Sequence, residues 1–165
     1  MKTLTKSSSL ISFFFSLLIA GSVFAALYGR PAVKVFLVGT VERNHQPLTL
    51  EKAGLLNPGE ILQWTIKSQN DGNAPAHHYK TIGEIPPGTS YVIGSARAEG
   101  NVGVVYSIDG GQSFEAKPMI DQKQPDGSVR KVAAPASSYT HVRYEWNDPL
   151  SEGKQVSAFY KVRVK

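Results

Sequence analysis

The chain has 165 residues, with 18 basic and 13 acidic side chains, a net charge of +5 and no cysteine. The lack of cysteine excludes disulfides and thiolate metal sites, and it leaves no cysteine to carry a lipid anchor. The basic residues are scattered among acids, with no run longer than Arg130–Lys131. The sequence therefore does not predict the clustered basic face that nucleic-acid binding requires.

Residues 1–25 have the three parts of a secretory signal peptide. Two lysines supply the positive start, and an apolar run with two serines extends over residues 10–20. Val23 and Ala25 are the residues that signal peptidase would read, which places the cut after Ala25. The alternative is an uncleaved membrane anchor, but the run is shorter than the roughly 20 apolar residues of a spanning helix. We expect export to the periplasm or the exterior, with residues 26–165 forming one domain.

The mature chain alternates between apolar and polar residues almost throughout, which is typical of β-strands. Residues 32–43 are rich in β-branched and aromatic side chains, and residues 60–69, 141–146 and 155–165 each have an apolar and a polar face. One packed face and one wet face are typical of antiparallel sheets. Turns rich in glycine, proline and asparagine separate these segments. We therefore predict an all-β, antiparallel immunoglobulin-like β-sandwich of about seven to eight strands.

Residues 117–139 are polar and rich in proline, and we interpret them as a long connection with a short strand at residues 129–132. The preceding stretch, YSIDGGQSF at residues 106–114, comes close to the "Asp box" of sialidases and other propeller proteins. It predicts a hairpin turn, because Asp109 can accept hydrogen bonds from its own turn and Gly111 tolerates positive φ. One hairpin cannot supply the several blades of a sialidase.

The spacing of the histidines and acids predicts no zinc or EF-hand site. His77 and His78 are adjacent, so on a strand they would point to opposite faces, and a zinc ion needs three or four converging ligands. His45 and His141 are distant in sequence. A looser calcium site at the edge of the sandwich stays open, and it would draw on Asp71, Asp109, Asp121 or Asp126.

No Ser/His/Asp assembly, nucleophile elbow or phosphate loop is present in the sequence. We therefore predict no catalytic residue, no cofactor and no enzyme activity. One covalent alternative stays open, because exported immunoglobulin-like domains can join a lysine to an asparagine with the help of a buried acid. Lys34, Asn147 and Glu84 are the residues to test for this isopeptide bond.

Residues 56–96 resemble the conserved-repeat family called domain of unknown function 11. The matching positions follow the order of the family pattern: Pro58-Gly59, then Asn70, Gly72, Asn73 and Ala76, then Glu84-Ile85-Pro86-Pro87-Gly88-Thr89, then Tyr91 to Ser95. Residues 106–114, 140–146 and 153–164 look like the closing half of the family, so the resemblance covers about residues 55–165. It implies a β-sandwich in a structural or adhesive setting, and it implies no catalytic residue.

Several matching residues have a physical role in turns. Gly59 and Gly72 permit turns that a side chain would obstruct. Pro86 and Pro87 fix φ and withhold N–H donors, so they should end a strand at the corner that follows Glu84.

Three aromatic residues on the predicted strands stand out. Trp64 and Trp146 are the residues expected at the centre of the core. Phe159 points outward, among basic neighbours, from the strand at residues 155–165, which we predict as an edge of its sheet. Because an edge strand can accept a partner strand, we predict that Phe159 contacts an unidentified envelope or extracellular protein.

The function expected from the sequence is an exported, non-catalytic structural or binding module. The alternative is a carbohydrate- or calcium-dependent binding domain, in which exposed tyrosines stack on sugar rings. The tyrosines proposed for this role are Tyr79, Tyr91 and Tyr139.

Overall fold

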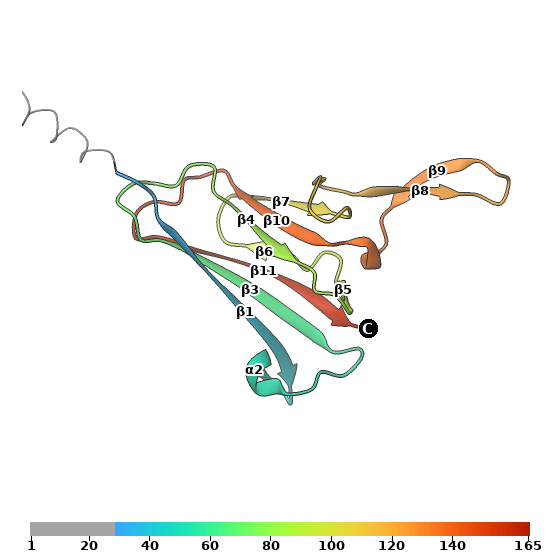
Figure 1. Cartoon of the computed structure of the whole chain (residues 1–165), viewed down its shortest axis with the longest axis horizontal. Helices are drawn as coiled ribbons and strands as arrows, with labels where there is room; N and C mark the ends of the chain where they lie inside the picture. Colours follow the sequence, from blue (N-terminus) through green and yellow to red (C-terminus); the bar gives the residue numbers. More distant parts are fainter. Residues whose placement is uncertain (1–28) are drawn as a thin grey trace, which may run out of the picture. The chain divides into compact units, whose positions relative to one another are not determined.

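The computed structural model describes residues 29–165, of which residues 31–165 form one compact unit. The predicted signal peptide at residues 1–25 lies outside the described residues. The described chain is mostly β-structure in antiparallel sheets, with one short α-helix (Figure 1). No helix within residues 29–165 has the length and apolar character needed to cross a membrane.

The larger sheet has six strands in the order β2-β1-β3-β11-β5, and β6 also pairs with β11. Every pairing in it is antiparallel. Its strands are β1 (Val33–Arg43), β2 (Gln46–Thr49), β3 (Ile61–Asn70), β5 (Thr89–Tyr91), β6 (Arg97–Ala98) and β11 (Gln155–Val164). The short helix α2 (Leu50–Ala53) directly follows β2.

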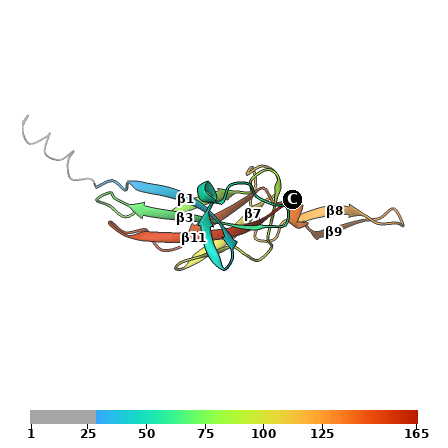
Figure 2. The same cartoon turned by 90° about the horizontal axis from the view of Figure 1, so that it is seen from below.

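Two smaller sheets complete the fold. A three-stranded sheet has the order β4-β10-β7, formed by β4 (Lys80–Glu84), β10 (His141–Trp146) and β7 (Val102–Ser107). A separate hairpin pairs β8 (Met119–Lys123) with β9 (Val129–Ala133), and a 3-10 turn, η2 (Ala136–Ser138), leads into β10. Both views of the ribbon show the hairpin extending away from the two larger sheets (Figures 1 and 2).

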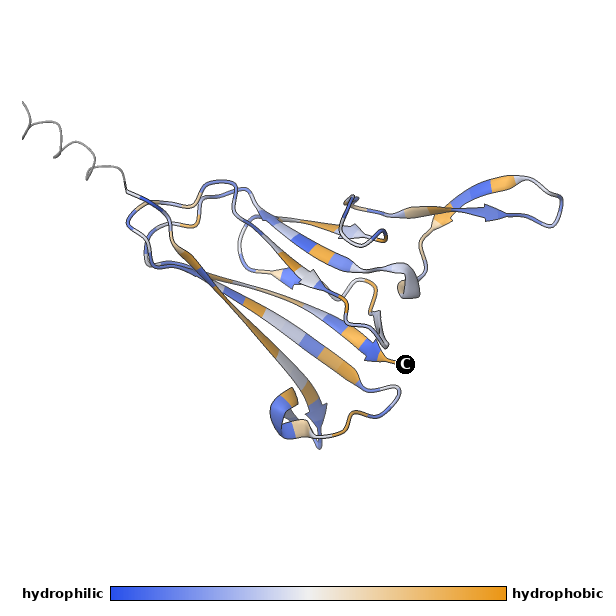
Figure 3. Ribbon diagram, in the orientation of Figure 1, coloured by the Kyte–Doolittle hydropathy of each residue, from blue (hydrophilic) through white to orange (hydrophobic). Residues whose placement is uncertain are grey.

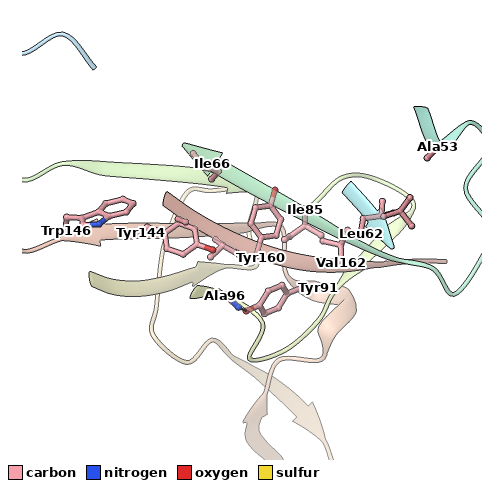
Figure 4. Packing of buried hydrophobic residues seen from close by; sticks show 13 residues of the cluster. Ala53, Leu62, Ile66, Ile85, Tyr91, Ala96, Tyr144, Trp146, Tyr160 and Val162 are labelled. Atoms are coloured by element: carbon pink, nitrogen blue, oxygen red, sulfur yellow. Dashed lines mark hydrogen bonds between the residues drawn. The ribbon is translucent and has the colours of Figure 1, made fainter. Parts of the chain in front are cut away.

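The six-stranded and three-stranded sheets contribute to one hydrophobic core (Figure 4). Its fully buried residues on β10 and β11 are Val142, Tyr144, Ala158, Tyr160 and Val162. The buried tyrosines also hydrogen bond across the core: the Tyr144 hydroxyl donates to the Phe159 carbonyl at 2.7 Å, and the Tyr160 hydroxyl donates to the Glu84 carbonyl. Colouring by hydropathy shows apolar and polar residues alternating along these strands (Figure 3).

The four strands with the clearest sequence pattern are present as β1, β3, β10 and β11. The expected total of seven to eight strands is wrong, because the described residues contain eleven. Three of the additional strands, β2, β5 and β6, are too short for alternation to reveal. Residues 117–139 were also wrongly interpreted as mainly a connection: the short strand at residues 129–132 is confirmed within β9, and it pairs with β8.

Two further expectations are corrected by the register. The strand at residues 155–165 is not an edge, because β11 has β3 on one side and β5 and β6 on the other. Trp146 is buried in the core with 6% exposure, but Trp64 is only partly buried at the margin of the core. The Trp64 ring lies over Gly39 of β1, where a Cβ atom would come within 2.8 Å of it, and it stays partly exposed because it lines a hollow together with Leu37 and Pro86.

Candidate functional site

Phe159 lies on the outer face of the larger sheet, which points away from the core. Along one row of this face, Val38 of β1 is paired with Thr65 of β3, Thr65 with Phe159, and Phe159 with Arg97 of β6. Two apolar side chains, a threonine and a guanidinium therefore follow one another across four strands. Phe159 is half-buried in this row.

Basic residues surround the row, and we call the whole surface the basic face. It consists of the outward residues Phe36, Val38, Thr65, Lys67, Arg97, Phe159, Lys161 and Arg163. Phe36 is 55% exposed and Val38 is 37% exposed. Two acidic residues border the face: Glu42, near the end of β1, and Glu99, which directly follows β6 and accepts a hydrogen bond from a backbone N–H of β11 at 3.1 Å. The face is therefore apolar along its middle and positively charged around it.

A shallow hollow continues the basic face toward β2. It has a volume of about 360 Å³ and is lined by Thr40, Glu42, Pro47, Ile61, Gln63 and Lys161. The lining offers one carboxylate, one ammonium and one amide next to two apolar side chains. This mixture suits the side chains of a docking protein, in which a few polar contacts orient an apolar one.

The predicted turn residues Gly59, Pro86 and Pro87 lie in turns between strands. Gly59 has a φ of 88°, and its N–H donates to the Val164 carbonyl at 2.9 Å. Pro86 and Pro87 come one residue after the end of β4, and the Pro86 carbonyl accepts hydrogen bonds from the N–H and the hydroxyl of Thr89 at 3.1 and 2.7 Å. These two hydrogen bonds close the turn at residues 86–89 and lead the chain into β5.

Gly72 lies in the turn after β3, where the side chain of Asn70 connects three segments. The Asn70 Oδ1 accepts the N–H of Ala32 at 3.0 Å and the N–H of Gly72 at 3.1 Å. Its Nδ2 donates to the carbonyls of Ala74 at 2.7 Å and Leu150 at 2.9 Å. Asn70 is fully buried, so every polar group of its amide has a protein partner. In the sequence Asn70 stands out only as a position of the family pattern, although it falls in the same alternating set as the apolar residues of β3, which already indicates the inward face.

Asp109 organises its own turn after β7. Its carboxylate accepts hydrogen bonds from the Ser107 hydroxyl at 2.7 Å, the Gln112 N–H at 3.1 Å and the Ser113 N–H at 3.0 Å. The hydroxyl and N–H of Ser113, followed by the Ser107 hydroxyl, hold the pKa of Asp109 well below its usual range. Gly111, with a φ of 87°, completes the turn. The hydrogen bonds of the Asp109 carboxylate therefore stabilise its own turn.

The four carboxylates proposed for calcium lie in separate places. Asp71 pairs with the Lys34 ammonium at 2.7 Å, and Asp109 is engaged in its turn. Asp121 belongs to β8, and Asp126 accepts the N–H and hydroxyl of Ser128 near the tip of the hairpin. Within residues 29–165, no group of three or more histidine or acidic side chains could hold a metal ion.

The three residues named for a possible isopeptide bond each have other surroundings in the structure, which does not favour that alternative. The Lys34 ammonium is engaged with Asp71, and its side chain is 67% exposed. The Asn147 amide donates to the Asn101 Oδ1 at 2.9 Å on the exposed surface. The reaction requires the amine and the amide to meet beside a buried acid, and Glu84 is itself exposed.

The tyrosines proposed for sugar binding pack against other rings. Tyr91 is 2% exposed, and its ring stacks on that of Tyr139 with centroids 5.2 Å apart. Tyr79 is half-buried, with its ring centroid 5.4 Å from that of Trp146 and its hydroxyl donating to Ser68. The expectation that Tyr91 is an exposed stacking platform is therefore wrong.

Comparison with known proteins gives no match: no family model, no curated protein and no solved structure is similar to this chain. The resemblance to domain of unknown function 11 stays a prediction. The chemistry of the chain's own surface must therefore carry the functional argument.

Proposed function

We propose that the protein is an exported, non-catalytic module of the bacterial envelope or exterior that acts through protein–protein contacts of its basic face. The observation that carries the proposal is the row Val38–Thr65–Phe159 on the outer face, bordered by the cations of that face. The signal-peptide pattern of residues 1–25 supports export.

The proposed architecture is an immunoglobulin-like β-sandwich. It is supported by the antiparallel pairing of every strand and by the single core to which the six-stranded and three-stranded sheets both contribute. The resemblance to domain of unknown function 11 agrees with this architecture and with a structural or adhesive role. Such a scaffold leaves the outer faces of its sheets free for recognition.

The partner proposed for the basic face is a protein surface with acidic residues around an apolar centre. A half-buried phenylalanine is suited to anchor a contact, because aromatic side chains dominate the energetics of interface centres. The surrounding cations would steer an acidic partner and fix its register. Binding should therefore weaken as salt is raised, since exposed charges are screened over about 8 Å at physiological ionic strength.

The test is a pull-down from envelope extract with the wild-type protein and Phe159→Asp. The carboxylate would enter the apolar row, so we expect at least a tenfold loss of the captured partner. The matched control is Val129→Asp, because Val129 is 66% exposed on the separate hairpin. Circular dichroism verifies that both variants fold. Equal recovery with both variants and the wild type would remove the basic face as the binding site.

Export is tested separately by sequencing the N-terminus of the protein recovered from the periplasm or medium. The proposal predicts that the mature chain begins at Ala26. A chain that keeps residues 1–25 and stays in the cytoplasm would contradict it.

A further inference from the structure

The N-terminal half of β1 is an open edge of the larger sheet within the described residues. β2 pairs with β1 only from Thr40 to Arg43, so among the strands of residues 29–165 only β3 pairs with residues 33–39. This stretch exposes four apolar side chains in succession: Val35 at 53%, Phe36 at 55%, Leu37 at 57% and Val38 at 37%. Phe36 and Val38 lie on the outer face, and the other two lie on the inner face.

The backbone of this edge offers unused hydrogen-bonding groups. The Asp71 N–H donates to the Ala32 carbonyl at 2.9 Å, which sets the alternation of the β1–β3 ladder. Residues 34, 36 and 38 therefore exchange hydrogen bonds with β3, and the N–H and C=O groups of residues 33, 35 and 37 point to the open side. An added strand would find a regular row of donors and acceptors there.

The open edge of β4 provides a contrast within the same molecule. Along β4, alternate residues form backbone hydrogen bonds with β10, so the backbone groups of Lys80, Ile82 and Glu84 point to the open edge. Charged side chains thus flank the apolar Ile82, a common protection against strand addition. The β1 edge carries one charged side chain, Lys34, where the shorter β4 edge carries two. Both lysines are ion-paired, Lys34 with Asp71 at 2.7 Å and Lys80 with Glu145 at 3.3 Å. With four exposed apolar side chains and a single charge, β1 is the less protected edge of the two.

We propose that the β1 edge pairs with the same edge of a second copy, antiparallel, about a two-fold axis at Phe36. The open stretch, residues 33–39, is centred on Phe36, so this axis uses its whole length. Val35 of each copy then lies opposite Leu37 of the other. Both residues direct their N–H and C=O groups to the open side, so they can exchange hydrogen bonds in this register. The two Phe36 rings lie side by side on the outer face, as favourable cross-strand aromatic pairs do.

The charged residues of the β1 edge are compatible with pairing between two copies. In this register Lys34 lies opposite Val38 of the other copy and keeps Asp71 as its own partner, so no like charges are placed opposite each other. A ribbon of this length buries less than the about 800 Å² per partner of a standard complex. We therefore expect a reversible dimer with a dissociation constant in the micromolar range. Pairing would also join the six-stranded sheets of the two copies into one continuous sheet, with both basic faces on the same side.

The test is sedimentation equilibrium of the full chain from about 1 μM to about 1 mM, a range that brackets micromolar association. Val35→Pro removes an outward N–H from the edge, where proline is tolerated, and should weaken dimerisation at least tenfold. The matched control is Ile82→Pro, because Ile82 is 50% exposed and also directs its N–H to an open edge. It should dimerise as the wild type does. A wild type that is monomeric throughout, or a Val35→Pro variant that dimerises normally, overturns the proposal.

A cross-linking experiment tests the register at the proposed two-fold axis. The chain has no cysteine, so Phe36→Cys introduces a single thiol. Opposed residues at a non-hydrogen-bonded site have Cα atoms about 4.5 Å apart, which is within the range of a disulfide. Phe36→Cys should form a disulfide dimer under mild oxidation at least ten times faster than Val38→Cys. Equal rates for the two variants contradict the two-fold axis at Phe36. Dimerisation is measured without any partner protein, so its failure is distinct from failure of the Phe159 test.

Discussion

The ring of Tyr160 lies against Gly83 of β4, in the space that a side chain at position 83 would occupy. A Cβ atom built on Gly83 would overlap Cε1 of Tyr160 and lie 2.9 Å from its Cζ. The hydroxyl of the same tyrosine donates to the carbonyl of Glu84, the next residue. One tyrosine of β11 therefore sets how closely β4 approaches the larger sheet.

Gly83→Ala should destabilise the protein by about 1–3 kcal/mol, because the added methyl group would force the Tyr160 ring or the β4 backbone to move. Gly103→Ala is the matched control. Gly103 also pairs with β10 in the smaller sheet, but its nearest neighbour would be the Glu145 carbonyl oxygen at an ordinary 3.8 Å. Urea unfolding measures both variants. Similar losses for the two would contradict the close packing of Gly83 and Tyr160.

Asn70→Asp should destabilise the protein by at least about 2 kcal/mol, although the two side chains have the same shape. The substitution replaces an Nδ2 group that donates to two carbonyls with an oxygen that repels them, and each buried polar group left unpaired costs about 1–3 kcal/mol. Asn147→Asp is the control, because its amide makes an exposed hydrogen bond. We expect less than about 0.5 kcal/mol there. A small effect at position 70 would show that its hydrogen bonds contribute little.

The buried tyrosines should make the protein lose stability in alkali. Burial raises the pKa of Tyr144 above its ordinary value, so the unfolded chain releases this proton first. The stabilising contribution is complete below about pH 10, the ordinary tyrosine pKa, and declines as the pH rises toward the folded-state pKa. Tyr144→Phe should therefore lose less stability than the wild type between about pH 10 and pH 12. Parallel curves from urea unfolding at each pH would argue against this linkage.

The turn after β7 should respond to acid in the opposite sense. Hydrogen bonds from Ser113 and Ser107 lower the pKa of Asp109, so its contribution is present above the ordinary aspartate pKa of about 3.9. It is lost as the pH falls toward the folded-state pKa. Between about pH 6 and pH 3, Asp109→Asn should lose less of its melting temperature than the wild type. The exposed Asp148→Asn serves as the control, and identical acid sensitivity of the Asp109 variant and the wild type would contradict the prediction.

The long strands could be predicted from the sequence because alternation and turn residues act locally. β10 spans the predicted residues 141–146, since its apolar face is regular and turns bound both ends. β5 and β6 have three and two residues, and they are strands only because β11 offers them a partner. No local pattern contains that information. The same applies to Trp64, because its position over Gly39 and beside a hollow lined by Leu37 and Pro86 follows from tertiary contacts.

The candidate site was predicted in part. The outward direction of Phe159 follows from strand alternation alone, and the register places it on the outer face of β11 as expected. Its neighbours Val38 and Arg97 come from segments far away in the sequence, so only the pairing of strands reveals the row. The open edge of β1 was also beyond local reasoning, because an edge is defined by which strand is missing beside it.

The most direct test of pairing at the β1 edge is amide hydrogen exchange along β1, followed by NMR at low and high protein concentration. The N–H groups of Phe36 and Val38 should be protected in both samples, because they bond to β3. Those of Val35 and Leu37 should exchange quickly in the dilute sample and become protected in the concentrated one. Fast exchange of Val35 and Leu37 at every concentration would contradict a contact surface built on this edge, and strong protection in the dilute sample would show that the edge is already covered.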